Sequence, residues 1–456
     1  MATDIARLSF DPARHYTGVA AQQGRVTLEA EQNEQRIIDA EERRLELIDI
    51  IGPAGTPDNG YAISPASGSD FTIRPGTMYA GGLRVTLDDH IPYSNQPDWL
   101  DHTDDPDWIA PSGKLGPYEH VVLVIQERDV TAVEDPALRE VALGGPDGGA
   151  RTILLQHVER KPTKAKDCFK ALADDEHAWA SQGLIFDPAT MQLRSESRLL
   201  VTWQGSPDPP DPCEPASTGG YLGAENQLIR VQITAVDPVK GAFDLLWGWD
   251  NASFLYRVTA DGSADPVLTL DRSPVDDYHR PRAGQAVQVL RAAAELRSTD
   301  AVVEGYVAAL HGQVAVLTAP YDPDTKTVQF PAPLPASYTD PKQTSQLYLR
   351  VWEEHLTGNT IGTPITLAGT GVQVTISLDG SGPVHVDDYW CIGVRPSTST
   401  QVYPERYLRT PQPPDGPRLW ACPLAVISSG GKKLTVVADC RRHFRPLIDL
   451  RPVAPT

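Results

Sequence analysis

Hydrophobic positions near the start of the chain predict one long helix. Between residues 29 and 51, apolar side chains recur at steps of three and four residues, which is the repeat of one helix face. The stripe consists of Ile37, Ile38, Leu45, Ile48 and Ile51, with Leu47 and Ile50 beside it. Carboxylates in the first turn favour a helix start, and Gly52-Pro53 ends the pattern. We therefore expect a helix from Glu29 to Ile51.

Two interpretations of this helix remain open. Its apolar stripe is short and its first half is charged, so it either lies on a β-domain of its own chain or serves as an oligomer-forming or docking helix. Residues 1–27 are expected to form an extended arm, because Gly18 and Gly24 interrupt any helix there. The residues of the arm that would contact a neighbouring subunit are Phe10, Tyr16, Gln22, Gln23 and Arg25.

After residue 53 the pattern changes to that of strands. Apolar and polar residues alternate around Pro-Gly and Gly-Gly turns in residues 61–87. The unbroken apolar run from Val121 to Ile125 predicts a strand buried on both faces. From residue 221 onward, short strands separated by Pro, Gly and Asp dominate. The fold class predicted is mainly β (α+β), with an N-terminal arm and helix followed by antiparallel β-sandwich or barrel-like modules.

The length of 456 residues suggests more than one domain. The proline-rich stretch at 206–220 is a shift in composition typical of a loop or linker. We expect five consecutive segments: an arm and assembly helix (1–53), a first β-module (54–160), a helix with a Pro-rich loop or linker (161–220), a second β-module (221–345), and a third β-module with a basic C-terminal segment (346–456).

Charge and cysteine content narrow the classes of partner. Forty basic and sixty acidic residues give a net charge of −20, which repels phosphate backbones, so nucleic acid is not an expected partner. No apolar run reaches the ~18 residues of a membrane span. Five cysteines are scattered without a CxxC pattern, and no signal region opens the chain. We expect reduced thiols in a cytosolic protein, and the pairing of Cys168 with Cys213 stays open.

Motifs of catalysis and metal binding do not occur in the sequence. The patterns GxSxG, GxxxxGK[ST] and HExxH are absent, and no pair of histidines has metal-ligand spacing. We therefore expect no catalytic residue, no metal and no cofactor. The loop PDWLDHTDDPDWIAP is rich in aspartate but lacks the spacing of a calcium loop. We interpret it as an acidic surface loop anchored by Trp99 and Trp108.

Two acidic motifs, GWDNASF (248–254) and VDDYW (386–390), would suit the paired carboxylates of a carbohydrate-cleaving site. The simpler interpretation is that Asp250-Asn251 and Asp387-Asp388 form turns at strand ends. The tryptophans Trp247, Trp249 and Trp390 would then fill the core.

The C-terminal stretch DCRRHFRPLIDLRP concentrates basic residues in an acidic chain. Arg441, Arg442 and Arg445 are candidate docking residues for the carboxylates of another subunit. The alternative is that they hold acidic loops of their own chain, and the sequence favours neither.

Seven segments, in order, carry a resemblance that extends from about Phe10 to Leu447. They are FDPARHYTGVAAQQGRVTLEAEQNEQ, DIIGPAGTP, VVLVIQERDVTAVEDPALREVALGGPDGGAR, DPCEPASTGGYLGAENQLIRVQI, LLWGWDNASF, VDDYWCIGVRP and ADCRRHFRPL. Their order resembles that of an uncharacterised domain family of phage-tail-like and contractile-injection-system proteins, whose members commonly begin with a phrase like FDPxKHYSGVxxQQGRVxLDADWNEQ. Gln32 stands where that phrase has Trp, LWGWDNASF replaces the usual KWSRxNGSV, and no fibre or β-helix segment follows.

The resemblance implies a non-enzymatic structural part of such a particle, at the baseplate, spike or fibre-attachment end. The implied partners are other tail or baseplate subunits and further copies of the chain, with a trimer favoured. Assembly would take place in the cytoplasm, and release with the particle stays open. One alternative is a carbohydrate-binding or carbohydrate-cleaving tail module, which the tryptophans and paired acids favour. The other is a cargo adaptor or plug.

Overall fold

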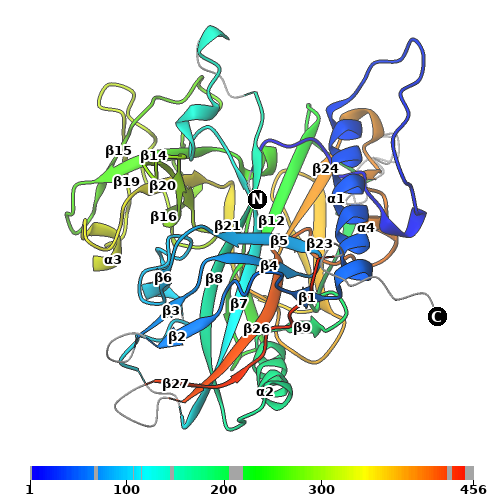
Figure 1. Ribbon diagram of the computed structural model, residues 1–456. Coiled ribbons are helices and arrows are strands. Elements are labelled where there is room, and N and C mark those ends of the chain that lie inside the picture. Colours follow the sequence, from blue (N-terminus) through cyan, green and yellow to red (C-terminus); the bar gives the residue numbers. More distant parts are fainter. Residues whose placement is uncertain are drawn as a thin grey trace, which may run out of the picture. The chain divides into compact units, whose positions relative to one another are not determined.

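The computed structural model describes residues 3–65, 70–105, 107–113, 116–143, 148–204, 219–428 and 434–446. These residues form several antiparallel sheets and four α-helices, α1 (Glu29–Ile51), α2 (Cys168–Ser181), α3 (Ala336–Thr339) and α4 (Arg406–Arg409) (Figure 1). The predicted mainly β fold is confirmed, and within the described residues no sheet closes into a barrel. The first helix has the bounds that the sequence predicts.

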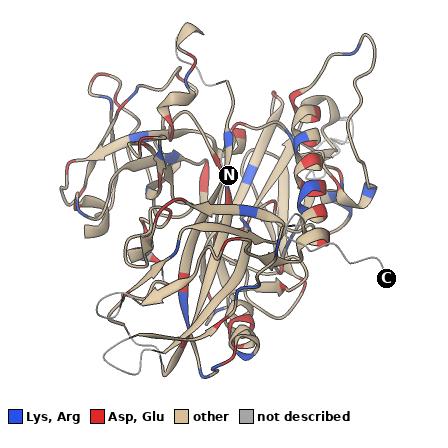
Figure 2. Ribbon diagram, viewed as in Figure 1, with Lys and Arg blue, Asp and Glu red and all other residues tan. Residues whose placement is uncertain are grey.

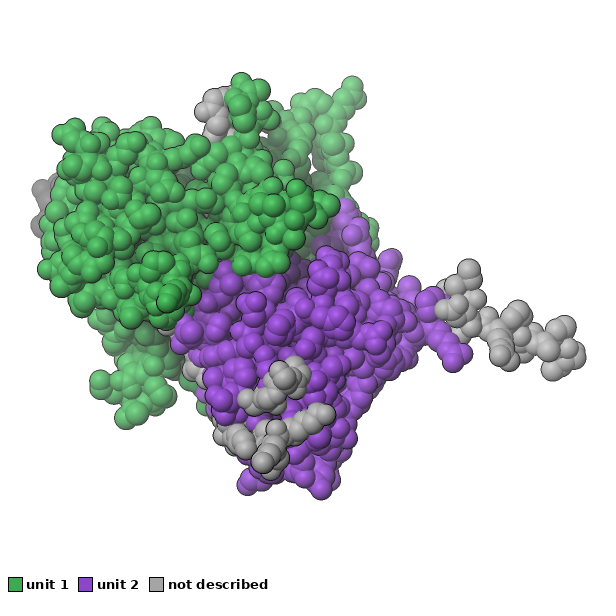
Figure 3. Space-filling model, turned by 60° about the vertical axis from the view of Figure 1, so that its left-hand side comes forward, with its two compact units in different colours: residues 1–37, 128–153, 195–417 green, residues 38–127, 154–194, 418–456 purple. Residues whose placement is uncertain are grey.

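The chain forms two compact units, each built from segments far apart in the sequence (Figure 3). Unit 1 comprises residues 1–37, 128–153 and 195–417, and unit 2 comprises residues 38–127, 154–194 and 418–456. The five segments expected from the sequence follow one another along the chain, whereas each unit gathers three separate stretches. Most of the predicted Pro-rich linker, residues 205–218, lies outside the described residues.

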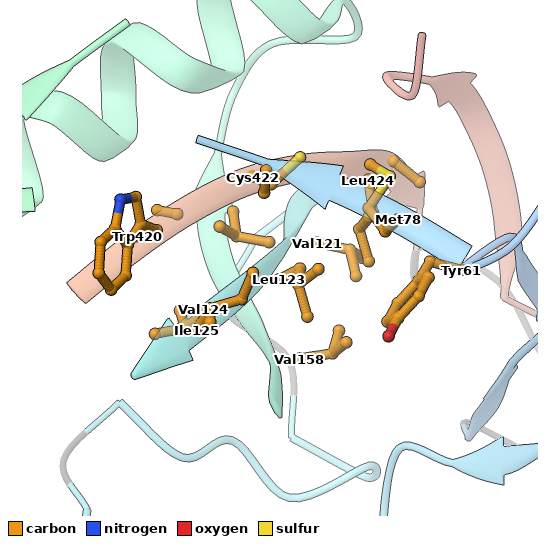
Figure 4. Close-up of a cluster of buried hydrophobic side chains, with 14 of the residues drawn as sticks. Tyr61, Met78, Val121, Leu123, Val124, Ile125, Val158, Trp420, Cys422 and Leu424 are labelled. Atoms are coloured by element: carbon orange, nitrogen blue, oxygen red, sulfur yellow. The ribbon is translucent and has the colours of Figure 1, made fainter. Parts of the chain in front are cut away.

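The main sheet of unit 2 places a C-terminal strand at its centre. Its order is β8-β7-β26-β10-β9, with β27 beside β26. The strands are β7 (Tyr118–Val130), β8 (Arg151–Thr163), β9 (Leu184–Asp187), β10 (Gln192–Ser195), β26 (Arg418–Ser428) and β27 (Thr435–Asp439). All five residues from Val121 to Ile125 are buried, as predicted for this strand. Figure 4 shows four of them, Val121, Leu123, Val124 and Ile125, beside Trp420, Cys422 and Leu424 of β26, so residues near position 120 and near position 420 form one core.

Two small sheets complete unit 2. One has the order β1 (Ala54–Gly55), β4 (Gly76–Ala80) and β5 (Leu83–Leu87), and the other has the order β2 (Ile63–Pro65), β3 (Phe71–Ile73) and β6 (Ile91–Pro92). The β4-β5 turn uses Gly81 and Gly82 at φ +58° and +77°. A Cβ on Gly82 would lie 2.0 Å from the carbonyl oxygen of Arg44, whose guanidinium Nη1 donates to Gly81 O at 3.1 Å. Glycine is therefore required where this turn meets the second half of α1.

Unit 1 contains a β-sandwich. A three-stranded sheet has the order β11 (Ser197–Trp203), β23 (Val372–Leu378) and β22 (Pro364–Thr366). A five-stranded sheet has the order β21 (Glu354–Thr360), β13 (Ala242–Gly248), β12 (Gln227–Asp237), β24 (Tyr389–Val394) and β25 (Val402–Tyr403). Their facing side chains make one core, in which Leu199 and Val374 pack with Ile229, Trp247 and Trp390.

A seven-stranded sheet forms the rest of unit 1. Its order is β17 (Val303–Ala308), β16 (Ala286–Arg297), β20 (Leu347–Val351), β14 (Leu255–Ala260), β15 (Val267–Leu270) and β19 (Thr327–Gln329), with β18 (Gln313–Val316) beside β16. Alternate residues of β20 belong to different cores, because successive side chains point to opposite faces of a strand. Leu347, Leu349 and Val351 lie in one apolar cluster and Tyr348 in another. This sheet is therefore buried on both faces at its centre.

The expectation of reduced thiols is wrong for two of the cysteines. Cys168, at the start of α2, forms a disulfide with Cys440, directly after β27, and their Cα atoms are 5.5 Å apart. The two lie 272 residues apart, so no local spacing in the sequence marks them as a pair. Cys391 and Cys422 are buried free thiols. Cys213 lies outside the described residues, and the open question of its pairing with Cys168 is answered by the bond of Cys168 to Cys440.

Candidate functional site

Residues 3–10 are anchored within unit 1. The carbonyl of Thr3 accepts a hydrogen bond from Asn251 Nδ2 at 2.8 Å, and that of Phe10 accepts one from Arg406 Nη1 at 3.1 Å. The guanidinium of Arg7 lies 5.6 Å from the ring centre of Tyr403. The exposed part of the predicted arm therefore begins only after Phe10.

Residues 11–28, which we name the N-terminal loop, are the most exposed stretch before α1 (Figure 1). Apolar side chains on this loop face solvent: Tyr16 is 53 % and Val26 is 82 % exposed, and Val19 and Leu28 are also exposed. The predicted contact residues Gln22, Gln23 and Arg25 are exposed as well. The loop is fastened to the first half of α1, because the Val19 N–H donates to Gln35 Oε1 at 2.5 Å and Ser9 Oγ donates to Glu34 at 2.7 Å. The loop is thus held just before its start and at its middle, and it exposes apolar side chains that the described chain does not cover.

The N-terminal loop and helix α1 differ in charge. Residues 11–28 contain Arg14, Arg25 and a single carboxylate, Asp11, whose Oδ2 lies 3.6 Å from Arg14 Nε, in a chain of net charge −20. Helix α1 carries eight carboxylates and three arginines, visible as alternating red and blue turns in Figure 2. The loop is therefore a basic and apolar segment with a chemistry complementary to acidic surfaces.

The predicted apolar stripe of α1 is only partly buried. Ile38 is 2 % exposed and Ile37, Ile48 and Ile51 are half-buried, whereas Leu45 is 44 % exposed. Ile50, beside the stripe, is 73 % exposed. The helix thus lies on its own chain through one face and keeps apolar side chains in solvent on another.

A salt bridge fixes the second half of α1 within unit 2. Glu41 accepts hydrogen bonds from Arg44 Nε at 2.9 Å and from Arg418 at the start of β26. Burial raises the pKa of Glu41, but the positive charges of Arg418 and Arg44 outweigh it and lower that pKa below its ordinary value. The acidic residues of the helix are therefore in part structural.

The three predicted docking arginines have different surroundings. Arg441 donates from Nη1 to the carbonyls of Asn59 at 3.0 Å and Gly60 at 2.8 Å, and its side chain is 5 % exposed. It therefore holds a loop of its own unit. Arg442 and Arg445 are exposed, so the predicted docking contact rests on these two.

A turn of three left-handed residues connects β13 to β14. Asp250, Asn251 and Ala252 have φ of +48°, +56° and +50°, a conformation that costs roughly 1–2 kcal/mol per non-glycine residue. Asn251 holds the turn, because its Nδ2 donates to Thr3 O and its Oδ1 accepts from Cys391 Sγ at 3.0 Å. The sequence predicts a turn here. Among residues other than glycine, Asn and Asp adopt the left-handed conformation most readily, so the Asp250-Asn251 pair indicates a turn in the sequence. No feature of the sequence indicates that Ala252 is left-handed.

Half-exposed aromatic rings lie beside this turn. Asp250 accepts a hydrogen bond from the hydroxyl of Tyr278 at 3.0 Å, and Tyr278 is 43 % exposed. The ring centre of Phe254 lies 5.6 Å from that of Tyr278 and 4.4 Å from that of His279. Burial raises the pKa of the Asp250 carboxyl, against the effect of the Tyr278 hydrogen bond. A carboxylate next to aromatic rings is an arrangement that binds sugars in other proteins, although the same residues also serve in packing.

The other predicted acidic pair has a structural role. Asp387 is 9 % exposed and accepts hydrogen bonds from Gln232 Nε2 at 3.3 Å and His311 Nδ1 at 2.9 Å. Asp388 accepts one from Ser195 Oγ at 2.5 Å, and burial raises the pKa of its carboxyl to about 6. Trp247 and Trp390 are fully buried, as the simpler interpretation predicts, and Trp249 is partly buried.

A polar hollow of about 580 Å³ lies in unit 2. Five ionisable side chains line it, namely Asp58, Arg74, Arg84, Asp88 and His90. Asp58 is held by the backbone N–H groups of Gly60 at 3.0 Å and Thr77 at 3.0 Å. Both signs of charge are present, so the hollow selects no single class of ligand.

Neither a metal-ligand cluster nor a membrane-spanning helix occurs in the described ranges. There, no three His, Cys, Asp or Glu side chains lie close enough together to hold a metal ion. None of the described helices is long and apolar enough to cross a membrane.

In the aspartate-rich loop, Trp99 is buried and its Nε1 donates to Asp105 Oδ2 at 3.2 Å, while the centre of its ring lies 5.1 Å from that of Trp108. The two tryptophans anchor this loop, as the sequence predicts.

The chain is similar to one protein family over its first part. A family model described as a family of unknown function, DUF6519, matches residues 1–192. That range holds the N-terminal loop, α1, α2 and every residue that lines the polar hollow. No curated protein and no solved structure matches the chain.

Proposed function

We propose that the protein is a non-enzymatic structural subunit of a phage-tail-like contractile injection particle, at its baseplate, spike or fibre-attachment end. The observation that carries the proposal is the N-terminal loop, which is fastened to α1 through Ser9 and Val19 and exposes apolar side chains. The loop also contains most of the phrase through which the sequence resembles proteins of such particles. It acts by packing against a neighbouring subunit.

Energetics favour a partner for this loop. Burying one Val or Leu side chain contributes about 1.5–3 kcal/mol, so covering Tyr16, Val19, Val26 and Leu28 supplies several kcal/mol toward assembly. Exposed single apolar residues are normal on protein surfaces, whereas this loop exposes four of them within thirteen residues. Three copies around an axis suit a spike or fibre attachment, and the carboxylates of α1 offer a complementary surface to the basic loop of the next copy.

A pair of matched variants tests this proposal. Tyr16→Ser with Val26→Ser removes two exposed apolar side chains of the loop, and Val239→Ser with Val275→Ser removes two that are 93 % and 84 % exposed elsewhere in unit 1. Each variant is produced with the products of the neighbouring genes, and sedimented particles are assayed for the chain. The loop variant is expected to be lost from the particles and the control to be retained. Equal incorporation of both would contradict the proposal.

The disulfide supports a particle that leaves the cell. A bond between Cys168 and Cys440 persists in oxidising surroundings and is rare in the cytosol. We therefore place assembly in the cytoplasm, followed by release with the particle and closure of the bond. Thiol alkylation of the chain before and after release tests this order, and a bond already closed in the cytoplasm would contradict it.

A second candidate function is glycan binding at the aromatic rings beside Asp250. The half-exposed Tyr278 and its carboxylate partner favour it. The test is a glycan array with the natural chain, Asp250→Ala and Tyr278→Ala. Binding that both substitutions abolish supports the candidate, and silence of the natural chain excludes it. A role as cargo adaptor or plug has no such observation behind it, and co-purification of an effector with the natural chain would be its test.

A further inference from the structure

The outer faces of two sheets in unit 1 carry buried polar side chains. On β12, Ile229, Val231 and Ile233 enter the sandwich core, and the alternate residues Arg230 and Gln232, each fully buried, point the other way. Gln232 Nε2 donates to the carbonyl of Leu310, two residues beyond β17, at 3.3 Å. The five-stranded and seven-stranded sheets therefore meet through these polar groups as well as through a small apolar cluster that contains Leu246, Ala286 and Trp352.

Gln288 and Arg350 occupy the seven-stranded side of this layer. They are paired directly across β16 and β20, so both side chains lie on the same face of the sheet. Gln288 is fully buried and Arg350 is 3 % exposed. Arg350 Nε and Nη1 and Gln288 Nε2 have no hydrogen-bond partner among the described residues. A buried donor left without an acceptor destabilises the folded chain.

The orientation of the Gln288 amide follows from its neighbour. Trp352 Nε1, which can only donate, lies 3.3 Å from Gln288 Oε1. Turning the amide over would place two donors against each other, so Nε2 must be the atom left without a partner. All three unpartnered atoms of the pair are therefore N–H donors.

Neighbouring carboxylates do not accept these hydrogen bonds. Glu134 accepts from the N–H of Thr131 at 2.9 Å and of Ala308 at 2.9 Å. Asp387 accepts from Gln232 and His311, as described above. Burial, and then the positive charge of Arg230, lower the pKa of the Arg350 guanidinium, while the charges of Glu134 and Asp387 oppose this. The site thus combines donors that need an acceptor with a positive charge.

We propose that Arg350 and Gln288 form a buried binding site for a small monovalent inorganic anion, for which chloride is the abundant occupant. The anion accepts hydrogen bonds from the guanidinium and from the amide, on the face of the seven-stranded sheet that carries both residues. A halide suits this site because it accepts from several donors at once and donates to none.

Bromide is the probe for this site. Crystals of the full chain grown in sodium bromide are expected to show an anomalous peak within hydrogen-bond distance of Gln288 Nε2 and the Arg350 guanidinium. The melting temperature is measured in sodium chloride, sodium bromide and sodium gluconate at one ionic strength, and the halides are expected to raise it by about 2–4 °C. Density for an ordered water without anomalous signal, or equal melting temperatures in the three salts, would overturn the proposal.

Two variants keep the test decisive. Gln288→Glu has nearly the same shape, keeps an acceptor for Trp352 Nε1, and supplies a negative charge at the position of Nε2, so it is expected to fold and to lose the response to halide. Gln313→Glu, on β18 of the same sheet and partly exposed, makes the same chemical change away from the site and is expected to keep the response. A folded Gln288→Glu chain with an unchanged halide response would show that the anion binds elsewhere.

Discussion

Removal of the disulfide between Cys168 and Cys440 is expected to destabilise unit 2 strongly. The bond joins residues 272 apart. In the chain-entropy model, closing a loop of that length stabilises the folded state by about 5–6 kcal/mol at 25 °C. Removing a native disulfide from a small domain typically lowers the free energy of unfolding by about 2–5 kcal/mol. Taking about 4 kcal/mol and about 2–4 °C per kcal/mol, we expect the melting temperature of unit 2 to fall by roughly 10 °C.

The assay compares the natural chain with Cys168→Ser/Cys440→Ser, each with and without reductant. Reductant is expected to lower the melting temperature of the natural chain to that of the variant and to leave the variant unchanged. Cys422→Ser is the control for loss of a buried thiol, and it is expected to keep the response to reductant. Alkylation of the unfolded, unreduced chain should leave Cys168 and Cys440 unmodified. The reasoning would be refuted if all five cysteines of the natural chain reacted and its melting temperature were the same with and without reductant.

Three further predictions concern single sites. Gly82→Ala should lower the free energy of unfolding by more than about 2 kcal/mol, because its Cβ would enter the backbone of α1. Gly241→Ala, also at positive φ but with nothing within 4 Å, should lower it by only about 1 kcal/mol. Midpoints of denaturant unfolding compare the two variants. Asn251→Gly should lower the melting temperature less than Asn251→Ala, because both variants lose the side-chain hydrogen bonds but only Ala keeps the strain of the left-handed backbone. Equal decreases in melting temperature would contradict this. Burial raises the pKa of Glu159, but Lys161 and His157 outweigh it and lower that pKa from 4.5 to about 2, so its contribution to stability is present above pH 4.5 and is lost as pH falls toward 2. Lys161→Met should therefore unfold at higher pH than the natural chain in an acid titration followed by circular dichroism, and identical midpoints would count against the pair.

Local patterns in the sequence predicted local structure well. The repeat of apolar residues and the stop at Gly52-Pro53 gave the bounds of α1, and the run from Val121 to Ile125 gave a strand buried on both faces. These features depend on neighbours along the chain, so their signals lie within a few residues.

Long-range features had no such signal. Strand β26 pairs with β7 across about three hundred residues, which places C-terminal and N-terminal segments in one sheet. The same pairing brings Cys440 to Cys168, because β27 pairs with β26 and ends next to Cys440, which is bonded to Cys168 at the start of α2. Periodicity states which face of a strand is apolar, but it does not state which strand lies beside it.

The candidate site was predicted in part. The sequence marked the N-terminal segment, but only the hydrogen bonds of Thr3 and Phe10 show that residues 3–10 are anchored, whereas residues 12–28 form a continuous exposed stretch. Arg441 looked like a surface residue and instead holds the carbonyls of Asn59 and Gly60. A charged residue in a sequence does not state whether a partner within the same chain will use it.

Photo-cross-linking from the N-terminal loop tests the central claim most directly. A photoreactive amino acid is placed at Val26, 82 % exposed in the loop, and in a matched chain at Val239, 93 % exposed elsewhere in unit 1. Purified particles are irradiated and the linked peptides are identified by mass spectrometry. The account predicts that position 26 links to a second copy or to another particle subunit in high yield and that position 239 does not. Links from position 26 only to its own chain, within intact particles, would contradict it.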